Sequence, residues 1–262
     1  MYKILIIGKR SFIGSNLKKY LSRYYSVDIL DFDYVYKKKN YFFLNYTHII
    51  NTSIHKYYVK KKYIKNYDFD RKFISKFSKI NFKYIFLNTR KIYLLNENIT
   101  ENSILKPTEP YSKNKLKTEK YLKSKIKKNL ISLRISNVIG KRIFNNYRKT
   151  HNLFFDNFLT YRKKKKIKVE NTFKDFLSID QFCKILYLII KSNITGIYNL
   201  SLSKRVFLSE LIFWIDKDFY KKIEFIPSRK GSFTLSNKKL LKKIKFIPTK
   251  KQLRLFCEKL FK

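Results

Sequence analysis

The sequence contains no alanine, and it is poor in glycine, proline, cysteine and acidic residues. Its 262 residues include 5 Gly, 4 Pro, 2 Cys and 18 Asp plus Glu, against 61 Lys plus Arg. Cys183 and Cys257 match neither a disulfide framework nor a zinc motif, which indicates a reducing compartment. No apolar run approaches the ~20 residues of a membrane-spanning helix, and the N-terminus lacks the pattern of a signal peptide. We therefore expect a cytoplasmic protein without a membrane partner.

The formal charge of +43 has a simpler explanation than nucleic-acid binding. Alanine, glycine, proline and most arginine codons are GC-rich, whereas those of lysine, asparagine, isoleucine, tyrosine and phenylalanine are AT-rich. The chain has 50 Lys but 11 Arg, and 21 Tyr with 24 Phe. An AT-rich genome would bias any protein in this way, so the charge is weak evidence for a nucleic-acid partner, which we do not expect. Since 44% of the residues are apolar, the chain can bury a core.

Short apolar runs alternate with segments of helical spacing along the first half of the chain. Strands are expected at Ile4–Ile7, Val27–Leu30, His48–Ile50, Tyr84–Leu87 and Leu130–Leu133. Helices are expected at Ile13–Tyr24, Lys60–Ser78 and Tyr111–Lys127. This alternation predicts an α/β fold with a parallel sheet and helices on both faces. The short interval between Asp31 and Thr47 predicts only a short strand and a loop.

The second half is less regular. A strand is expected at Ile167–Val169, a helix at Ile179–Lys191, a strand at Gly196–Leu200 and short helices at Leu208–Ile215 and Lys238–Lys243. The histidines lack acidic or cysteine neighbours at ligand spacing, so no metal site is expected at His48, His55 or His151.

A glycine-containing turn follows the first strand and opens the first helix. In Gly8-Lys9-Arg10-Ser11-Phe12-Ile13-Gly14, Gly8 permits a tight turn and Gly14 a close approach of helix and strand. Such a turn binds the pyrophosphate of a dinucleotide through backbone N–H groups and the helix dipole. Asp31 ends the second strand, where a carboxylate accepts the adenosine ribose hydroxyls and favours NAD. Lys9 or Arg10 could instead pair with a 2′-phosphate, so NADP remains an alternative.

Tyr111 and Lys115 lie four residues apart near the start of a predicted helix, so they share a face. A lysine ammonium beside a phenol lowers the pKa of the phenol and makes it a usable acid and base. Thr89, at the end of a predicted strand, could hydrogen-bond the same substrate oxygen. The spacing alone is uninformative, because the chain is rich in Tyr and Lys and the same spacing recurs at Tyr121 and Lys125. The position of Tyr111 and Lys115 after the glycine turn and Thr89 is what indicates a catalytic pair.

With these motifs in this order, the chain resembles the extended short-chain dehydrogenase/reductase family, in its NAD-dependent epimerase/dehydratase (nucleotide-sugar) branch. The segments that carry the resemblance are Gly8–Gly14, Asn88–Tyr93, Pro110–Lys115 with Glu119, Leu133–Gly140, Lys174–Asp180, Gly196–Leu200 and Pro227–Gly231. The resemblance implies a Rossmann-type, doubly wound parallel sheet with a small C-terminal α/β substrate lobe. The nucleotide-binding domain would span 1–160, with a return segment at about 173–200, and the lobe would lie mainly in 161–262.

The resemblance also implies site residues. Tyr111, Lys115 and Thr89 would be catalytic, with Thr89 orienting the substrate oxygen. Asn137 and Arg229 would bind the diphosphate of a nucleoside-diphosphate sugar. The residues implied at the NAD site are Gly8, Arg10, Ser11, Phe12, Ile13, Gly14, Asp31, Asn51 and Lys115.

The function implied is an NAD(P)-dependent nucleotide-sugar epimerase that makes precursors of a surface polysaccharide. One alternative is an NAD(P)H-dependent nucleotide-sugar reductase similar to dTDP-4-dehydrorhamnose reductase. An alternative of another class is a non-catalytic NAD(P)-sensing or RNA-binding protein on the same fold. The family usually dimerises through two helices, which here are Lys60–Ser78 and Tyr111–Lys127, so a homodimer is expected.

The sequence departs from the family at two positions. Ser11 stands where the middle glycine of the turn is usual, so a side chain is expected where backbone should approach the pyrophosphate. Arg90-Lys91 follows Thr89, where sugar 4,6-dehydratases carry an acidic pair. Elimination of water needs such an acid and base, so dehydratase activity is disfavoured.

Overall fold

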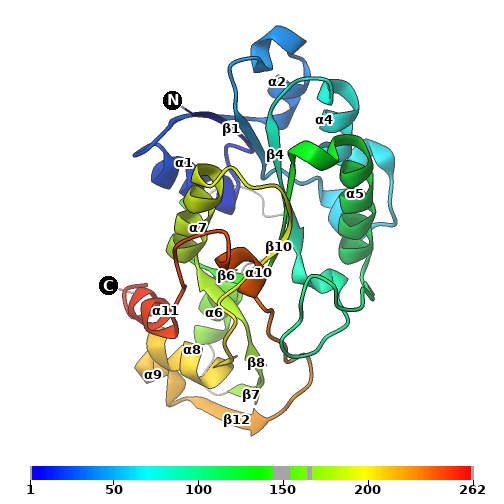
Figure 1. Ribbon diagram of the computed structural model, residues 1–262. Helices are drawn as coiled ribbons and strands as arrows, with labels where there is room; N and C mark the ends of the chain where they lie inside the picture. The colour runs from blue at the N-terminus through cyan, green and yellow to red at the C-terminus, as the bar shows by residue number, and fades with distance from the viewer. Residues whose placement is uncertain (1, 144–153, 164–166, 261–262) are drawn as a thin grey trace.

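A computed structural model describes residues 2–143, 154–163 and 167–260 of the chain (Figure 1). Its centre is a six-stranded, wholly parallel sheet in the order β10-β5-β4-β3-β1-β2. The strands are β1 (Lys3–Ile7), β2 (Ser26–Leu30), β3 (His48–Asn51), β4 (Lys83–Thr89), β5 (Leu130–Ile135) and β10 (Gly196–Leu200). The sequence predicted all six to within two residues at either end. The α/β, Rossmann-type fold class is therefore confirmed.

Helices cover both faces of the sheet, which explains why its inner strands are rich in apolar residues. One face carries α1 (Phe12–Leu21) and α7 (Ile179–Lys191), and the other carries α2 (Phe32–Tyr36), α4 (Phe69–Phe77) and α5 (Pro110–Ile126) (Figure 1). Alternate residues of each strand enter the two cores. On β1, for example, Ile4 and Ile6 pack with α1 and α7, whereas Leu5 and Ile7 pack with the opposite helices.

Two expectations about local structure were wrong. The interval after Asp31 forms α2 and a 3₁₀ helix at Asn40–Phe43 rather than a strand, because Phe32 and Val35 are spaced to bury one helical face. The expected helix at 60–78 is three short helices, α3 (Lys56–Lys60), a 3₁₀ turn at Lys65–Tyr67, and α4. Asp68 adopts an extended conformation and its carboxylate accepts the N–H of Arg71, so a new helix begins there.

Three small two-stranded sheets and five helices accompany the central sheet in the C-terminal half (Figure 1). The pairs are β6 (Asn137–Ile139) with β9 (Phe176–Ser178), β7 (Ile167–Asn171) with β12 (Ile223–Pro227), and β8 (Phe173–Lys174) with β11 (Val206–Phe207). The helices are α6 (Phe154–Arg162), α8 (Leu208–Ile215), α9 (Lys217–Tyr220), α10 (Lys238–Leu241) and α11 (Lys250–Cys257). The expected boundary at 160–161 falls inside α6, and the limits of the two domains remain a prediction.

None of the helices in the described residues combines the length and apolarity needed to cross a bilayer. Within the same residues, no three His, Cys, Asp or Glu side chains gather where they could bind a metal ion. His151 lies outside the described residues.

His48 on β3 predicts a specific dependence of stability on pH. It is 1% exposed, and its Nε2 has no hydrogen-bond partner among the described residues. Burial, helped by the charge of Lys83, lowers the pKa of His48 to about 4. In the unfolded chain the imidazole of His48 takes up a proton near its ordinary pKa of ~6.5, whereas in the folded protein it stays neutral down to about pH 4. The contribution of His48 to stability is therefore complete above pH 6.5 and is lost as the pH falls towards 4.

We therefore expect His48 to account for a loss of about 3 kcal/mol in the free energy of unfolding between pH 6.5 and 4. His48→Phe should keep the packing and remove this part of the pH dependence. Urea unfolding of both proteins at pH 7, 5.5 and 4 measures the difference. Parallel curves for the two proteins would contradict the assignment.

Candidate active site

The carboxyl ends of β1, β3 and β4 lie side by side at one edge of the sheet, because these strands are parallel neighbours. Gly8 follows β1, Thr52 follows β3 and Thr89 ends β4. The chain order reverses between β1 and β3, since β2 lies on the far side of β1. In open parallel sheets, ligands bind in the crevice that such a reversal leaves at the carboxyl edge. These three residues therefore frame the candidate site.

The turn after β1 accepts only glycine at two positions. Gly8 has a φ of +116°, and its N–H donates to the carbonyl of Leu30 at 2.7 Å. A Cβ added to Gly8 would lie 2.6 Å from Oγ1 of Thr52. A Cβ added to Gly14 would lie 2.5 Å from the same atom and 2.7 Å from the carbonyl oxygen of Gly8. The turn is thus packed closely enough to bring backbone N–H groups against a ligand.

The side chain of Ser11 is engaged within the protein, and the effect of this departure on pyrophosphate binding stays a prediction. Its hydroxyl caps α1 by accepting the N–H of Gly14 at 2.8 Å, and it donates to Oγ1 of Thr52 at 2.6 Å. The side chain is therefore held against the loop after β3. Among the described residues the N–H groups of Phe12 and Ile13 have no hydrogen-bond partner. A helix N-terminus with free N–H groups suits an anionic phosphate, so the turn fits a dinucleotide.

Asp31 lies where a ribose-binding carboxylate is expected, directly after β2. It adopts an extended conformation at the start of α2, and its side chain makes no capping hydrogen bond. Nη2 of Arg10 lies 3.9 Å from its carboxylate, and both side chains are about half exposed. The pair places an acceptor for ribose hydroxyls next to a cation suited to a 2′-phosphate. The geometry is compatible with NAD and with NADP.

Asn51, expected at the cofactor, has its side chain engaged within the protein. Its amide donates to Oδ1 of Asp70 at 3.0 Å, and its carbonyl accepts the N–H of Ser53 at 3.0 Å. It is buried at the end of β3. A direct contact of Asn51 with the cofactor stays a prediction, whereas its contact with Asp70 is a feature that the sequence did not indicate.

An exposed ion pair joins the segment that follows Thr89 to the segment that precedes Tyr111. Nζ of Lys91, two residues after Thr89, lies 2.7 Å from the carboxylate of Glu109, two residues before Tyr111. Pro110 starts α5, as the sequence predicted, and Tyr111 lies in the first turn. The three residues predicted to be catalytic thus come from the end of β4 and the first two turns of α5.

The charge environment of Tyr111 differs from that predicted from Lys115 alone. Burial, followed by the negative charge of Asp70, raises the pKa of Tyr111. Lys115 does not offset this within the protein, because its ammonium lies 3.8 Å from Oδ2 of Asp70. A phenol with a raised pKa is held in its protonated form, which is the form that can donate to a substrate oxygen.

The two residues predicted to bind a diphosphate lie in the C-terminal half. Asn137 begins β6, and its backbone N–H donates to the carbonyl of Asp175 at 3.2 Å. Arg229 is exposed in the turn after β12. No contact joins their side chains within the described residues, so their roles stay predictions.

Arg90, which follows Thr89, and Lys174 on β8 were not selected from the sequence as site residues. The guanidinium of Arg90 lies 3.8 Å from the ring centre of Phe233, and its Nε is buried without a partner among the described residues. Burial lowers the pKa of Arg90 to about 10. Burial, followed by the charges of Arg90 and Lys91, lowers the pKa of Lys174. Both residues lie in segments that resemble the family motifs, Asn88–Tyr93 and Lys174–Asp180, but only the fold brings their charges close enough to interact.

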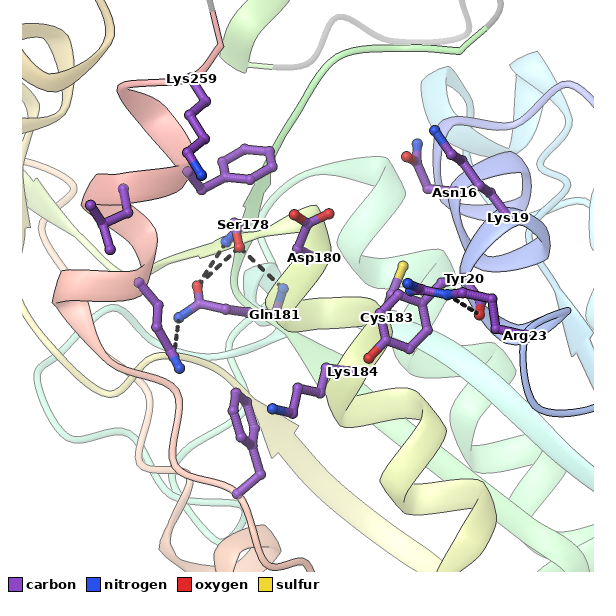
Figure 2. Close-up of a pocket in the computed structure, with 14 residues that line it drawn as sticks. Asn16, Lys19, Tyr20, Arg23, Ser178, Asp180, Gln181, Cys183, Lys184 and Lys259 are labelled. Carbon is purple, nitrogen blue, oxygen red and sulfur yellow. Dashed lines mark hydrogen bonds between the residues drawn. The ribbon is translucent and has the colours of Figure 1, made fainter.

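A groove of about 650 Å³ opens elsewhere, between α1, α7 and α11 (Figure 2). Lys19 of α1 and Arg23, in the turn after it, line the groove with Asp180 and Lys184 of α7, and Lys259 lies beyond the end of α11 (Figure 2). None of the residues predicted for catalysis or cofactor binding lines this groove. Its volume therefore does not locate the chemistry.

Solved structures share this fold over nearly the whole chain. A dTDP-glucose 4,6-dehydratase from Bacillus anthracis, in complex with NAD, has a TM-score of 0.76 and 16% identity and covers 100% of this chain and 96% of its own. A UDP-N-acetylglucosamine 4-epimerase from Methanobrevibacter ruminantium has a TM-score of 0.76 and 19% identity, and the match covers 99% of this chain and 96% of that one. A dTDP-4-dehydrorhamnose reductase from Clostridium acetobutylicum has a TM-score of 0.75 and 15% identity, and the match covers 99% of this chain and 98% of that one. At these identities the likeness shows the fold alone.

The sequence itself carries a family signature. No curated protein sequence matches the chain. The family model of the NAD dependent epimerase/dehydratase family matches residues 62–201, which is more than half of the chain and includes Thr89, Tyr111 and Lys115. The chain belongs to the NAD-dependent epimerase/dehydratase family.

Proposed function

We propose that this protein is a nucleotide-sugar epimerase that keeps NAD bound through its catalytic cycle. The observation that carries the proposal is the joint placement of Thr89, Tyr111 and Lys115 at the carboxyl end of β4 and the start of α5. This group lies along the same sheet edge as the glycine turn, whose backbone fits a pyrophosphate. Epimerases, dehydratases and reductases with this fold act on nucleoside-diphosphate sugars, and we propose that class of substrate here.

Each of the three residues has one proposed task. Tyr111 would take a proton from a sugar hydroxyl as the phenolate and return it as the phenol; its raised pKa favours the phenol and so supports the return step. The hydroxyl of Thr89 hydrogen-bonds the same sugar oxygen. Lys115 holds the nicotinamide ribose, because its ammonium makes no hydrogen bond within the described residues. NAD, when bound, supplies a reversible hydride acceptor for the sugar carbon.

The residues after Thr89 argue against a dehydratase. Elimination of water needs an acid and a base near the sugar. Lys91 is paired with Glu109, and Arg90 is stacked on Phe233, so this segment presents cations instead. The diphosphate of a nucleotide sugar is a suitable counter-charge for the basic cluster of Arg90, Lys91 and Lys174.

A reductase that uses NADPH is the second candidate, and Arg10 is the observation in its favour. Its guanidinium lies beside Asp31, at the place where a 2′-phosphate would project. A dehydrorhamnose reductase is among the proteins of similar fold. Such an enzyme would use the same Tyr111, Lys115 and Thr89 but would consume one reduced cofactor in each turnover.

Native mass spectrometry of the purified protein, followed by denaturation and identification of released cofactor, separates these functions. We expect NAD to be retained, and the protein to interconvert epimers of a UDP- or dTDP-sugar by NMR without added cofactor. A protein that is isolated empty and then binds NADPH would favour the reductase. Failure to bind either cofactor would overturn both proposals. The same spectra show whether the protein forms the homodimer that the family resemblance implies.

A further inference from the structure

Lys115 stands apart from the other lysines because it lies inside the protein. It is 7% exposed and is the one buried lysine among the described residues, in a chain that contains 50. Its ammonium lies 4.5 Å from the ring centre of Phe86 on β4 and 5.8 Å from that of Tyr58 on α3. Rings attract a cation, but they do not replace the solvation that water gives it.

Asp70 on α4 supplies the opposite charge, and its carboxylate is held in one orientation. Oδ1 accepts two hydrogen bonds, from Nδ2 of Asn51 at 3.0 Å and from the hydroxyl of Tyr84 at 2.8 Å. Oδ2 accepts none among the described residues and lies 3.8 Å from Nζ of Lys115. Asp70 is itself buried. Neutral donors from β3 and β4 thus fix one oxygen and leave the other directed at the ammonium.

The charges around this pair come from each element packed against it. Burial lowers the pKa of Lys115, whereas the charges of Asp70 and then Asp68 raise it. Burial raises the pKa of Asp70, while Lys115 lowers it and Asp68 raises it. The phenols of Tyr84, Tyr58 and Tyr111 face the same cluster from β4, α3 and α5. The negative charge of Asp70 therefore favours the protonated form of Lys115, and the positive charge of Lys115 favours the ionised form of Asp70.

We propose that Asp70 is a positioning residue of the site: it keeps the buried ammonium of Lys115 protonated and fixed at the start of α5, where its N–H groups meet the cofactor ribose. The inference rests on the proposed function, since it extends the roles given there to Lys115 and Tyr111. Asp70 lies outside every segment that resembles the family motifs. A carboxylate that contacted only neutral donors would not stabilise the ammonium, whereas Oδ2 of Asp70 lies next to Lys115 and accepts no hydrogen bond from another described residue.

The pH dependence of Asp70→Asn tests the proposal. The amide keeps the shape and the bonds to Tyr84 and Asn51 can re-form, but Lys115 loses its counter-ion, so the pKa of its ammonium falls. We expect the alkaline limb of kcat/KM to move by about one pH unit or more towards acid. The dissociation constant of NAD, measured by calorimetry from pH 6 to 9, should begin to rise at a correspondingly lower pH.

Asp68→Asn is the matched control. Asp68 is equally buried and two residues away, but its carboxylate caps α4 and accepts from Tyr63 and Thr118. This variant should lose thermal stability while its alkaline limb moves far less than that of Asp70→Asn. Equal shifts in the two variants, or no shift in Asp70→Asn, would overturn the proposal.

A double-mutant cycle with Lys115→Met tests the pair without any catalytic readout. Removing one member of a buried ion pair leaves an uncompensated charge, whereas removing both does not. The urea midpoint of Asp70→Asn/Lys115→Met should therefore lie above the value expected from the sum of the single changes. Additive changes would overturn the proposal even if the enzyme is active. An inactive wild type with a non-additive cycle would instead reject the proposed function and keep the pairing.

Discussion

Tyr111→Phe is expected to lower kcat of the proposed epimerase by about 10²- to 10⁴-fold, the range typical of a lost general acid and base. The change removes one hydroxyl, which has no hydrogen-bond partner among the described residues, and keeps the ring that packs at the start of α5. Stability should therefore stay within about 0.5 kcal/mol of the wild type. Epimer interconversion followed by NMR gives kcat, and thermal unfolding shows that the variant is folded.

Tyr121→Phe provides the comparison, since Tyr121 and Lys125 have the same spacing on the same helix. Tyr121 packs against the guanidinium of Arg71, 4.3 Å from its ring centre, on the side of α5 that meets α4. Its variant should keep activity within about 2-fold of the wild type, because it touches no reacting group. If the two variants lose activity equally, Tyr111 has no special role and the catalytic assignment is wrong.

Glu119→Ala is expected to cause the largest loss of stability, about 3 to 5 kcal/mol. Glu119 is buried on α5, and its carboxylate accepts from Nη2 of Arg134 at 2.6 Å, Nδ2 of Asn88 at 2.7 Å and the hydroxyl of Ser132 at 2.6 Å. Alanine would leave a buried guanidinium without its counter-ion, because Nε and Nη2 of Arg134 lose their acceptor, and would leave two neutral donors unpaired. Because the contacts join α5 to β4 and β5, the variant should also disturb the position of Tyr111.

An exposed ion pair calibrates this measurement. Arg254 and Glu258 form an i,i+4 pair at 2.7 Å near the C-terminus. Glu258→Ala should cost about 0.5 kcal/mol or less, because solvent screens the charges. Urea unfolding of the three proteins gives the comparison. A loss below about 1 kcal/mol for Glu119→Ala would show that water replaces the missing carboxylate and that the pair does not stabilise the fold.

The regular elements were predictable where burial is complete. The inner strands of the central sheet are covered on both faces, so they are short runs rich in apolar residues. The expected helices at Ile179–Lys191 and Leu208–Ile215 agree with α7 and α8 residue for residue. Between residues 31 and 78 only β3 was predicted correctly. Lysine and tyrosine obscure the helical spacing of this segment, and the sequence did not distinguish the capping role of Asp68 from that of a surface acid.

The candidate site was predictable in part for a similar reason. Gly8 and Asp31 follow strands and Thr89 ends one, and the carboxyl ends of parallel strands meet at one edge, so chain order alone places all three at that edge. The partnership of Asp70 with Lys115 was not predictable, because 45 positions separate them and only the packing of α4 against α5 makes them neighbours. The hydrogen bond of the Ser11 side chain likewise depends on Thr52, in the loop after β3.

The buried carboxylates have a consequence for the interpretation of sequences with a strong codon bias. Asp68, Asp70, Glu119 and Asp175 are enclosed by protein, in a chain that has only 18 acidic residues. When mutation pressure supplies lysine at most polar positions, an individual lysine conveys little information, whereas a rare acid conveys more. In such chains the residue types that the bias disfavours are therefore the better starting point for locating chemistry, even when the abundant type performs it.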